Sequence, residues 1–276
     1  MAQQHAKTGD TLRVESITKA FGGLKVFHDV SFEVPPGGLL GVIGPNGAGK
    51  TTMINIISGR LPPSSGRVML GERRVDSQPV AANAAKGLVR SFQQTATFAG
   101  QTVEDNLLSA LRFSGRERNV LERLAHLLDR FGLIENWRRN AEVLPYGLQK
   151  MLGLTMALAT EPRMLLLDEP AAGLEKSERS NIDDYITFAQ AEFNCGVLLV
   201  EHDMDLIKRL CGSVIVMDGG KLIAEGPPSE VLSHKEVIDA YLGRGDDDDD
   251  IGSNDLGGIG NAEGVELKEA ANATHP

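Results

Sequence analysis

The sequence predicts an α/β fold with a mixed sheet at its core, an antiparallel β region near the N-terminus and an inserted helical subdomain. Three observations carry this prediction. Short apolar, β-branched runs alternate along the chain with longer helical patterns, which is typical of an α/β sheet. The earliest runs alternate apolar and polar residues with period two, as half-buried strands do. From residue 102 to residue 159 the pattern becomes almost entirely helical.

The expected strands follow from these runs. Alternating residues predict strands at 12–17 and 30–34, and the turn residues at 35–38 then lead into a fully apolar strand at 39–43. Four further apolar runs predict buried strands, at 88–92, 164–167, 197–200 and 214–217.

The helical subdomain is predicted to cover about residues 102–159 and to lie between two strands of the sheet. Within it an apolar stripe recurs at helical spacing and stops at Gly132, a residue type that commonly ends helices. The stripe consists of Leu121, Leu124, Leu128 and Phe131. The simplest interpretation is a helical subdomain that branches from an α/β core.

The net charge of −10 is concentrated in the C-terminal tail. Residues 244–276 contain nine acidic and two basic residues, so the rest of the chain holds 29 acidic and 26 basic residues. This near balance argues against general nucleic-acid binding through a basic patch. The tail has five consecutive aspartates and few large apolar residues, so we expect it to be disordered. Residues 1–10 are expected to form a flexible N-terminus, which leaves 11–243 as the folded domain.

The cysteines and the apolar segments bear on the compartment. The two cysteines, Cys195 and Cys211, stand far apart without a partner motif, which favours a reducing compartment over a disulfide scaffold or a zinc site. The N-terminus lacks the apolar core of a signal peptide, and no run reaches the roughly 18 apolar residues that a membrane span needs. We therefore expect a cytosolic protein that is able to dock on a membrane partner.

The segment G-P-N-G-A-G-K-T-T matches the phosphate-binding pattern G-x-x-x-x-G-K-[ST], with an apolar strand before it and a helical pattern after it. Glycines let backbone N–H groups surround phosphate oxygens, and the helix N-terminus adds partial positive charge. Lys50 supplies a point charge to the β- and γ-phosphates, and Thr51 a hydroxyl for Mg²⁺. The alternative, an ordinary glycine-rich turn, does not explain the flanking pattern. The candidate residues are Gly44, Pro45, Asn46, Gly47, Ala48, Gly49, Lys50, Thr51 and Thr52.

The run M-L-L-L-D-E supplies two acids at the end of an apolar strand. Asp168 is placed to offer a carboxylate to Mg²⁺ at the C-terminal edge of the sheet, where ligands of α/β proteins bind. Glu169 follows immediately and is a candidate general base that polarises an attacking water. Alone this pattern is weak, because many buried strands end in acids; after a phosphate-binding loop it is strong.

Two more polar residues follow expected strands. His202, in V-L-L-V-E-H-D-M, is a candidate contact for the γ-phosphate, although a lone histidine at such a place is more often structural. Gln93, in V-R-S-F-Q-Q, opens the helical region, and its amide is a candidate ligand for Mg²⁺ or water that would report the state of the nucleotide to the helices.

The order of the motifs carries a family resemblance. K-A-F-G-G-L with Phe21, the phosphate-binding loop, the Gln93 loop, L-P-Y-G-L-Q-K, L-L-L-D-E-P, A-G-L-E and V-E-H-D-M follow one another over about residues 11–243. This order resembles the ATP-binding subunits of ABC transporters. The finer sequences F-G-G-L, V-R-S-F-Q, D-E-P-A-A-G-L, E-H-D-M and A-Y-L-G are similar to those of the ATPase subunits of branched-chain (hydrophobic) amino acid importers.

The resemblance implies a P-loop NTPase fold of the ABC ATPase type and the hydrolysis of ATP to ADP and phosphate. It also implies a role for each candidate residue. Phe21 would stack on adenine, and residues 44–52 would hold the phosphates. Thr51, Gln93 and Asp168 would serve Mg²⁺, with Glu169 as the base and His202 as the γ-phosphate sensor.

The resemblance further implies partners. Members of the family work as head-to-tail dimers, in which each nucleotide lies between one P-loop and the signature loop of the other subunit. The second ATPase subunit would be a copy of this chain or a related one. Transmembrane permease subunits would bind directly, a substrate-binding protein would act indirectly, and no nucleic acid is expected. The chain would then lie on the cytoplasmic face of the inner (plasma) membrane.

The stretch from Leu144 to Lys150 aligns with the signature L-S-G-G-Q but departs from it. Pro145 replaces the serine and lacks its hydroxyl, Tyr146 replaces the first glycine, and Gly147 matches. Leu148 replaces the glutamine, unless Gln149 takes that role one residue later. Proline is tolerated in the first turn of a helix, so the helix N-terminus and the Gly147 N–H are still expected to face phosphate. We interpret the stretch as a degenerate but working signature.

A second departure is Glu175, where the family's dimer-contact loop usually carries aspartate or asparagine. Alternatives to an amino acid importer remain open. One is the ATPase subunit of a urea importer or a lipopolysaccharide exporter. Another is a soluble ABC ATPase acting on DNA or ribosomes, which would call for paired ATPase domains, a coiled coil or basic arms. A P-loop kinase is the third, but it leaves the signature and His202 unexplained.

Overall fold

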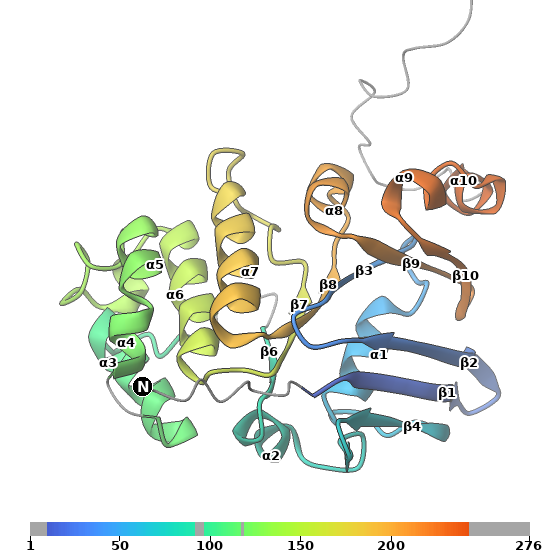
Figure 1. Cartoon of the computed structure of the whole chain (residues 1–276), viewed down its shortest axis with the longest axis horizontal. Coiled ribbons are helices and arrows are strands. Elements are labelled where there is room, and N and C mark those ends of the chain that lie inside the picture. The colour runs from blue at the N-terminus through green and yellow to red at the C-terminus, as the bar shows by residue number, and fades with distance from the viewer. Residues whose placement is uncertain (1–9, 92–96, 117–118, 243–276) are drawn as a thin grey trace, which may run out of the picture. The chain divides into compact units, whose positions relative to one another are not determined.

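Two sheets lie on either side of helix α1 (Lys50–Ile57), as Figure 1 shows. The computed structural model describes residues 10–91, 97–116 and 119–242. The chain divides into two units, 1–243 and 244–276, and the second unit, like residues 1–9, lies outside the described residues. The predictions of a flexible N-terminus and of a disordered tail therefore stay predictions.

The first sheet is antiparallel and has the strand order β2-β1-β4-β5. Its long pair confirms the antiparallel region expected from the alternating residues, although both strands are longer than predicted. The strands are β1 (Leu12–Phe21), β2 (Leu24–Val34), β4 (Ser65–Leu70) and β5 (Arg73–Arg74).

The second sheet is mixed and has the order β10-β9-β3-β8-β7-β6. Neighbouring strands from β9 to β6 run parallel, and β10 pairs antiparallel at the edge. Its strands are β3 (Leu39–Ile43), β6 (Leu88–Arg90), β7 (Met164–Asp168), β8 (Gly196–Val200), β9 (Ser213–Asp218) and β10 (Lys221–Gly226). The predicted mixed sheet is thus confirmed.

Successive side chains of the second sheet enter two different cores, because strand residues alternate between faces. On β7, for example, Leu166 packs into the core that holds α1 and the first sheet, while Leu165 and Leu167 pack against the helices on the opposite face. Strands buried on both faces need apolar residues at every position, which is why the sequence reads as continuous apolar runs there.

Helices from the second half of the chain cover that opposite face (Figure 1). They are α7 (Ser180–Phe193), α8 (Met204–Leu210), α9 (Pro228–Val231) and α10 (Lys235–Leu242). The short helix α2 (Val80–Ala85) precedes β6.

The segment predicted to be helical contains α3 (Val103–Ser114), α4 (Asn119–Arg123), α5 (Ala125–Arg130), a 3₁₀ turn (Ala141–Val143) and α6 (Tyr146–Ala159). Gly132 ends α5 with φ +70°, as the sequence predicts. The apolar stripe is buried at Leu124, Leu128 and Phe131, but Leu124 separates α4 from α5. The boundary of a helical subdomain at 102–159 stays a prediction.

Three strands were not predicted. β4, β5 and β10 carry charged or small residues on exposed positions, so no apolar run marks them in the sequence. Each is held by antiparallel pairing to a neighbour that does bury an apolar face. None of the helices in the described ranges is long and apolar enough to cross a bilayer.

A buried amide fixes the segment before α3. Asn106 is fully buried, and its side chain accepts a hydrogen bond from the Phe98 N–H at 2.7 Å and donates to the carbonyls of Phe98 and Thr102 at 3.1 and 2.9 Å. Phe98 is thereby held in place although half of its surface is exposed.

We expect Asn106→Ala to lower the free energy of unfolding by about 1–3 kcal/mol, because it leaves backbone groups of the preceding loop unsatisfied. Ser109→Ala is the matched control on the same helix. Its hydroxyl makes an exposed contact to Gln101, so its loss is expected to cost no more than about 0.5 kcal/mol. Urea unfolding measures both, and equal effects would contradict the role of the buried amide.

Candidate functional site

The three central strands of the mixed sheet end at one level. Val42 of β3 pairs with Val200 of β8, and Val200 pairs with Asp168 of β7. The phosphate-binding loop follows β3, His202 follows β8, and Asp168 closes β7. Parallel strands in one register therefore bring three of the predicted motifs to the same edge of the sheet.

The loop between β3 and α1 has the backbone expected of a phosphate cradle. Gly49 forms the N-cap of α1 at φ +104°, and a Cβ there would lie 2.6 Å from the ring of Phe27. Gly47 has φ +79°, and a Cβ there would meet nothing within 4 Å. The helix start is thus packed tightly from behind, while the middle of the loop is open for backbone N–H groups to approach a ligand.

The Lys50 amine folds back over its own loop. Its Nζ donates to the carbonyls of Gly44 and Pro45 at 2.6 and 3.1 Å, and the residue is buried. Burial lowers the pKa of this amine, and the charges of Glu169 and Asp168 oppose that shift. The charged Lys50 amine is therefore held at the loop by two backbone carbonyls, which the oxygens of a bound phosphate can replace.

The other predicted loop residues divide by exposure. Pro45 and Ala48 are buried in the turn, while Asn46 is exposed. Thr51 is exposed and Thr52 half-buried, both in the first turn of α1. Thr51 is thus exposed at a helix N-terminus, and its place beside a phosphate-bound cation stays a prediction.

Asp168 forms a buried ion pair that the sequence did not indicate. Arg90 of β6 donates from Nη2 to its Oδ2 at 3.0 Å and from Nη1 to Asn55 of α1 at 2.6 Å. The side chains of Arg90 and Asp168 are 7% and 1% exposed. Burial raises the pKa of Asp168, and the Arg90 guanidinium opposes the shift. Arg90 thus ties the carboxylate to the helix that starts at the phosphate loop; its only sequence signal was a charge within an apolar strand.

The second oxygen of Asp168 is a candidate metal ligand. Oδ1 is buried and has no hydrogen-bond partner among the described residues. A buried carboxylate oxygen left in this state is costly unless a ligand satisfies it. Mg²⁺ is commonly held by one or two carboxylates together with phosphates of the substrate. Asp168 with Thr51 therefore fits the chemistry of a phosphate-bound Mg²⁺.

Glu169 and His202 face each other across the ends of β7 and β8. Glu169 Oε1 lies 3.1 Å from His202 Nε2, and both side chains are partly exposed. The Glu169 N–H donates to the Val200 carbonyl at 2.9 Å, which holds the residue at φ +51°. Positive φ is uncommon for a residue other than glycine, and it tends to occur at functional sites. A carboxylate paired with an imidazole, open to solvent, is suited to accept a proton from water.

Phe21 lies at the end of β1, 49% exposed, with the Lys19 amine 4.9 Å from its ring centroid. Lys19 pairs across the sheet with Phe27, whose ring contacts the Cβ position of Gly49. The antiparallel sheet therefore reaches the phosphate loop through Phe27 and carries Phe21 as an exposed aromatic ring on the same strand pair. Gln93 lies outside the described residues, so its predicted role stays a prediction.

The signature stretch starts helix α6. Pro145 is the exposed N-cap residue of α6 rather than a member of its first turn, and the helix begins at Tyr146. Leu148 packs against the core, and the Gln149 side chain donates to the Leu144 carbonyl at 2.8 Å. Both side chains are therefore engaged in contacts within their own chain.

The signature loop contacts the segment that follows Glu169. A Cβ on Gly147 would lie 2.1 Å from a carboxylate oxygen of Glu178, and the ring of Tyr146 lies against Gly173. Glu178 also accepts the Glu175 N–H at 3.0 Å. The two loops that the resemblance assigns to the dimer contact thus support each other within one chain.

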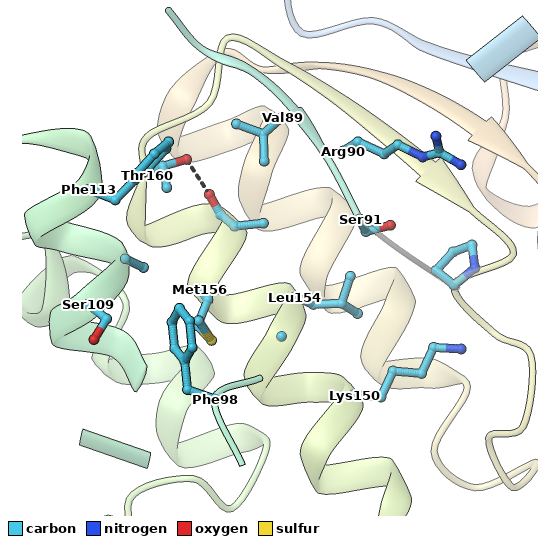
Figure 2. A pocket seen from close by; sticks show the side chains of 14 residues that line it. Val89, Arg90, Ser91, Phe98, Ser109, Phe113, Lys150, Leu154, Met156 and Thr160 are labelled. Carbon is cyan, nitrogen blue, oxygen red and sulfur yellow. Dashed lines mark hydrogen bonds between the residues drawn. The ribbon is translucent and has the colours of Figure 1, made fainter. Parts of the chain in front are cut away.

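A pocket of about 300 Å³ lies between β6, α3 and α6 (Figure 2). Phe98 and Phe113 stand on one side of it with Met156, and Arg90 and Lys150 on the other. Both phenylalanines are about half exposed. No sequence pattern indicates this pocket, because its walls come from three separate parts of the chain.

Comparison with known proteins identifies two family models. The model described as "ABC transporter" matches residues 27–172, and the model described as "Branched-chain amino acid ATP-binding cassette transporter" matches residues 221–247. The first match includes the phosphate loop, the signature stretch and Glu169.

Curated relatives are similar to this chain over most of its length. The high-affinity branched-chain amino acid transport ATP-binding protein LivG of Salmonella typhimurium is 37% identical over 248 residues, covering 84% of this chain and 97% of LivG. The corresponding protein BraF of Pseudomonas aeruginosa is 36% identical over the same shares.

Solved structures are similar as well. An ATP-binding cassette of an ABC transporter in its ADP conformation superposes with a TM-score of 0.74 at 31% identity, covering 85% of this chain and 99% of that one. A nucleotide-free cassette gives a TM-score of 0.72 at 30% identity, covering 84% and 98%.

We expect Glu169→Gln to bind Mg-ATP but to hydrolyse it at least about 100-fold more slowly, because the amide keeps the shape and cannot accept a proton. Lys50→Ala is the control for the other half of the site, and it should weaken nucleotide binding itself. Binding of a fluorescent ATP analogue and release of phosphate measure the two effects. Wild-type turnover by Glu169→Gln would remove Glu169 from the reaction.

Proposed function

The chain belongs to the ABC transporter ATP-binding family, and from that premise we propose that it powers an importer of branched-chain or other hydrophobic amino acids. It is an ATPase, as its family membership implies. The fold class and family resemblance predicted from the sequence are confirmed by these matches. The observation that carries the substrate class is the second family match, at residues 221–247, together with the names of LivG and BraF.

The geometry supports a direct route for hydrolysis. Water attacks the γ-phosphorus, the bond to the bridging oxygen of ADP breaks, and phosphate and ADP leave. Glu169 takes the proton of the attacking water. His202, whose Nε2 lies 3.1 Å from the Glu169 carboxylate, holds that carboxylate in its orientation. Lys50 exchanges its loop carbonyls for phosphate oxygens. Mg²⁺, held by Asp168 and Thr51, would neutralise charge on the phosphates.

The proposed function calls for a dimer of ATPase subunits, in which the start of α6 has a binding partner. Pro145 and Tyr146, at the N-terminus of α6, are exposed and therefore accessible to a second subunit. In the head-to-tail arrangement of the family, this helix end would face the nucleotide of a second ATPase subunit. Partial positive charge at a helix start suits phosphate even without the serine hydroxyl.

A membrane subunit is the second partner in the proposal. The pocket between α3 and α6 is lined mainly by apolar side chains and exposes Phe98 and Phe113 beside it. It also reaches Pro170, the residue after Glu169, and the end of β6. A short cytoplasmic helix of a permease seated there would touch both the helical segment and the catalytic strands. The chain would thus work at the cytoplasmic face of the membrane, with a substrate-binding protein acting through the permease.

The test of the proposal is co-purification followed by transport. The chain, expressed with its native membrane subunits and reconstituted into vesicles, is expected to drive ATP-dependent uptake of leucine, isoleucine or valine. Uptake of urea instead, or export of lipopolysaccharide, would replace the substrate class while leaving the ATPase role intact. Recovery without any membrane subunit would favour a soluble ABC ATPase.

We expect Phe113→Ser to reduce co-purification of the permease and coupled transport, with little change in the ATPase activity of the isolated chain. Ile238→Ser is the matched control, because Ile238 is also an exposed large apolar residue but lies on α10. Quantitative pull-down from detergent extracts compares the two. Equal retention of the permease by both variants would place the docking surface elsewhere.

The signature loop gives a further test. Pro145→Ser introduces a hydroxyl at the N-cap of α6, where it is expected to reach the phosphate of the opposing nucleotide. A hydrogen bond to a charged group contributes about 1.5–3 kcal/mol, so we expect a tighter ATP-bound dimer in a Glu169→Gln background. Sedimentation with Mg-ATP measures the dimerisation constant. An unchanged constant would mean that residue 145 does not face the γ-phosphate of the partner site.

A further inference from the structure

Two buried charges beside the site have no part in the proposed chemistry. Lys150 lies on α6 and is 5% exposed, and Glu201 follows β8 and is 4% exposed. Charged side chains are almost never this deeply buried unless they are paired or hydrogen-bonded. The hydrogen bonds of Lys150 and Glu201 therefore indicate which segments these two side chains hold in place.

Lys150 reaches from the signature helix to the turn after β7. Its Nζ donates to the carbonyl of Glu169 at 3.3 Å and, through a short hydrogen bond, to the carbonyl of Ala172. Both acceptors are backbone groups of the segment that carries the catalytic glutamate. One amine thus fixes the two ends of a four-residue turn.

Glu201 holds the same turn from the other side. Its Oε1 accepts the Ala171 N–H at 2.8 Å, and its Oε2 accepts the His202 N–H at 3.1 Å. One carboxylate therefore joins the turn after Glu169 to the histidine that faces Glu169. The two catalytic side chains are positioned through backbone groups on either side of them.

The charge of Glu201 also stabilises the charged form of Lys150. Burial lowers the pKa of the Lys150 amine and raises the pKa of the Glu201 carboxyl. The negative charge of Glu201, followed by that of Glu169, opposes the shift at Lys150. Removing the charge of Glu201 would therefore leave Lys150 buried with less compensation, whereas the charge of Glu201 is compensated by backbone N–H groups.

The turn needs such support because Glu169 is held at φ +51°. A non-glycine residue in this region is strained and persists only where its surroundings determine the conformation. The hydrogen bond from the Glu169 N–H to Val200 fixes one side of the residue, and Lys150 fixes its carbonyl.

We propose that Lys150 and Glu201 are positioning residues, which hold the turn 169–172 so that Glu169 and His202 are aligned for the attack of water. The inference rests on the proposed role of Glu169 as the base. It assigns no contact with ATP to either residue. Loss of either is therefore expected to slow the chemical step without weakening nucleotide binding.

The test uses Lys150→Met, which keeps the length of the side chain and removes the charge and donors, and Lys150→Arg, which restores both. We expect Lys150→Met to lower kcat roughly 10- to 100-fold, because small displacements of a catalytic group cost about that much. The Kd for an ATP analogue should change less than about twofold. Lys150→Arg should recover most of kcat.

Asp76→Asn is the matched control for loss of a buried charge. Asp76 is 3% exposed and accepts the Val68 N–H at 2.8 Å in the antiparallel sheet. It is expected to lower the melting temperature and to leave kcat unchanged at a temperature where every variant is folded. A similar result for Lys150→Met, a lower melting temperature with wild-type kcat, would overturn the proposal.

Glu201→Gln makes an independent test, and it serves alone if Lys150→Met does not fold. The amide offers only one acceptor atom, so the contact to Ala171 or to His202 is lost. We expect a lower kcat again, and a double variant that loses less than the product of the two single losses, because both residues hold one turn. Independent, multiplicative losses would overturn the shared role. Glu169→Gln tests the role of Glu169 as the base separately from the positioning role of Lys150. If Glu169→Gln is inactive, the role of Glu169 is supported even where the Lys150 variants contradict the positioning role.

Discussion

Parallel pairing of β3, β8 and β7 in one register is the constraint on which the candidate site depends. Because Val42, Val200 and Asp168 are aligned across the sheet, the phosphate loop, His202 and the acidic pair emerge side by side. The alignment is stabilised by burial on both faces, since successive side chains of these strands enter two separate cores. A shift of one residue in any strand would exchange the two faces and move a candidate catalytic group away from its neighbours.

Three buried cations organise the electrostatics around that edge. Lys50 rests on the carbonyls of its own loop, Arg90 pairs with Asp168, and Lys150 binds the carbonyl of Glu169. The roles that we propose for them differ, since the first would bind phosphate, the second would orient a candidate metal ligand and the third would support the turn that carries the candidate base. Burying them is costly, and the cost is offset because every one donates to a carboxylate or a backbone carbonyl.

Helix α6 connects the signature stretch with the turn that follows Glu169. Its first turn carries the signature stretch, and the same helix supports the turn of Glu169 through Lys150. Gly147 lies against Glu178, so the loop between Glu169 and α7 is held at both ends by α6. The departures from the signature at Pro145 and Leu148 leave these contacts intact, because they are made by Gly147 and by positions deeper in the helix.

The sequence by itself determined the α/β class, the family, the phosphate loop and the acids at the end of β7, because these rest on local spacing and on continuous apolar runs. It also located Gly132 as a helix end. Tertiary structure alone decided the rest. Arg90, Lys150 and Glu201 act through partners up to 78 residues away in the chain, such as Asp168 for Arg90. Strands β4, β5 and β10 lack apolar runs and exist through pairing with their neighbours. In the sequence, a long-range contact of this kind is visible at most as a charged residue within an apolar segment. The sequence pattern does not show which residue that charge pairs with.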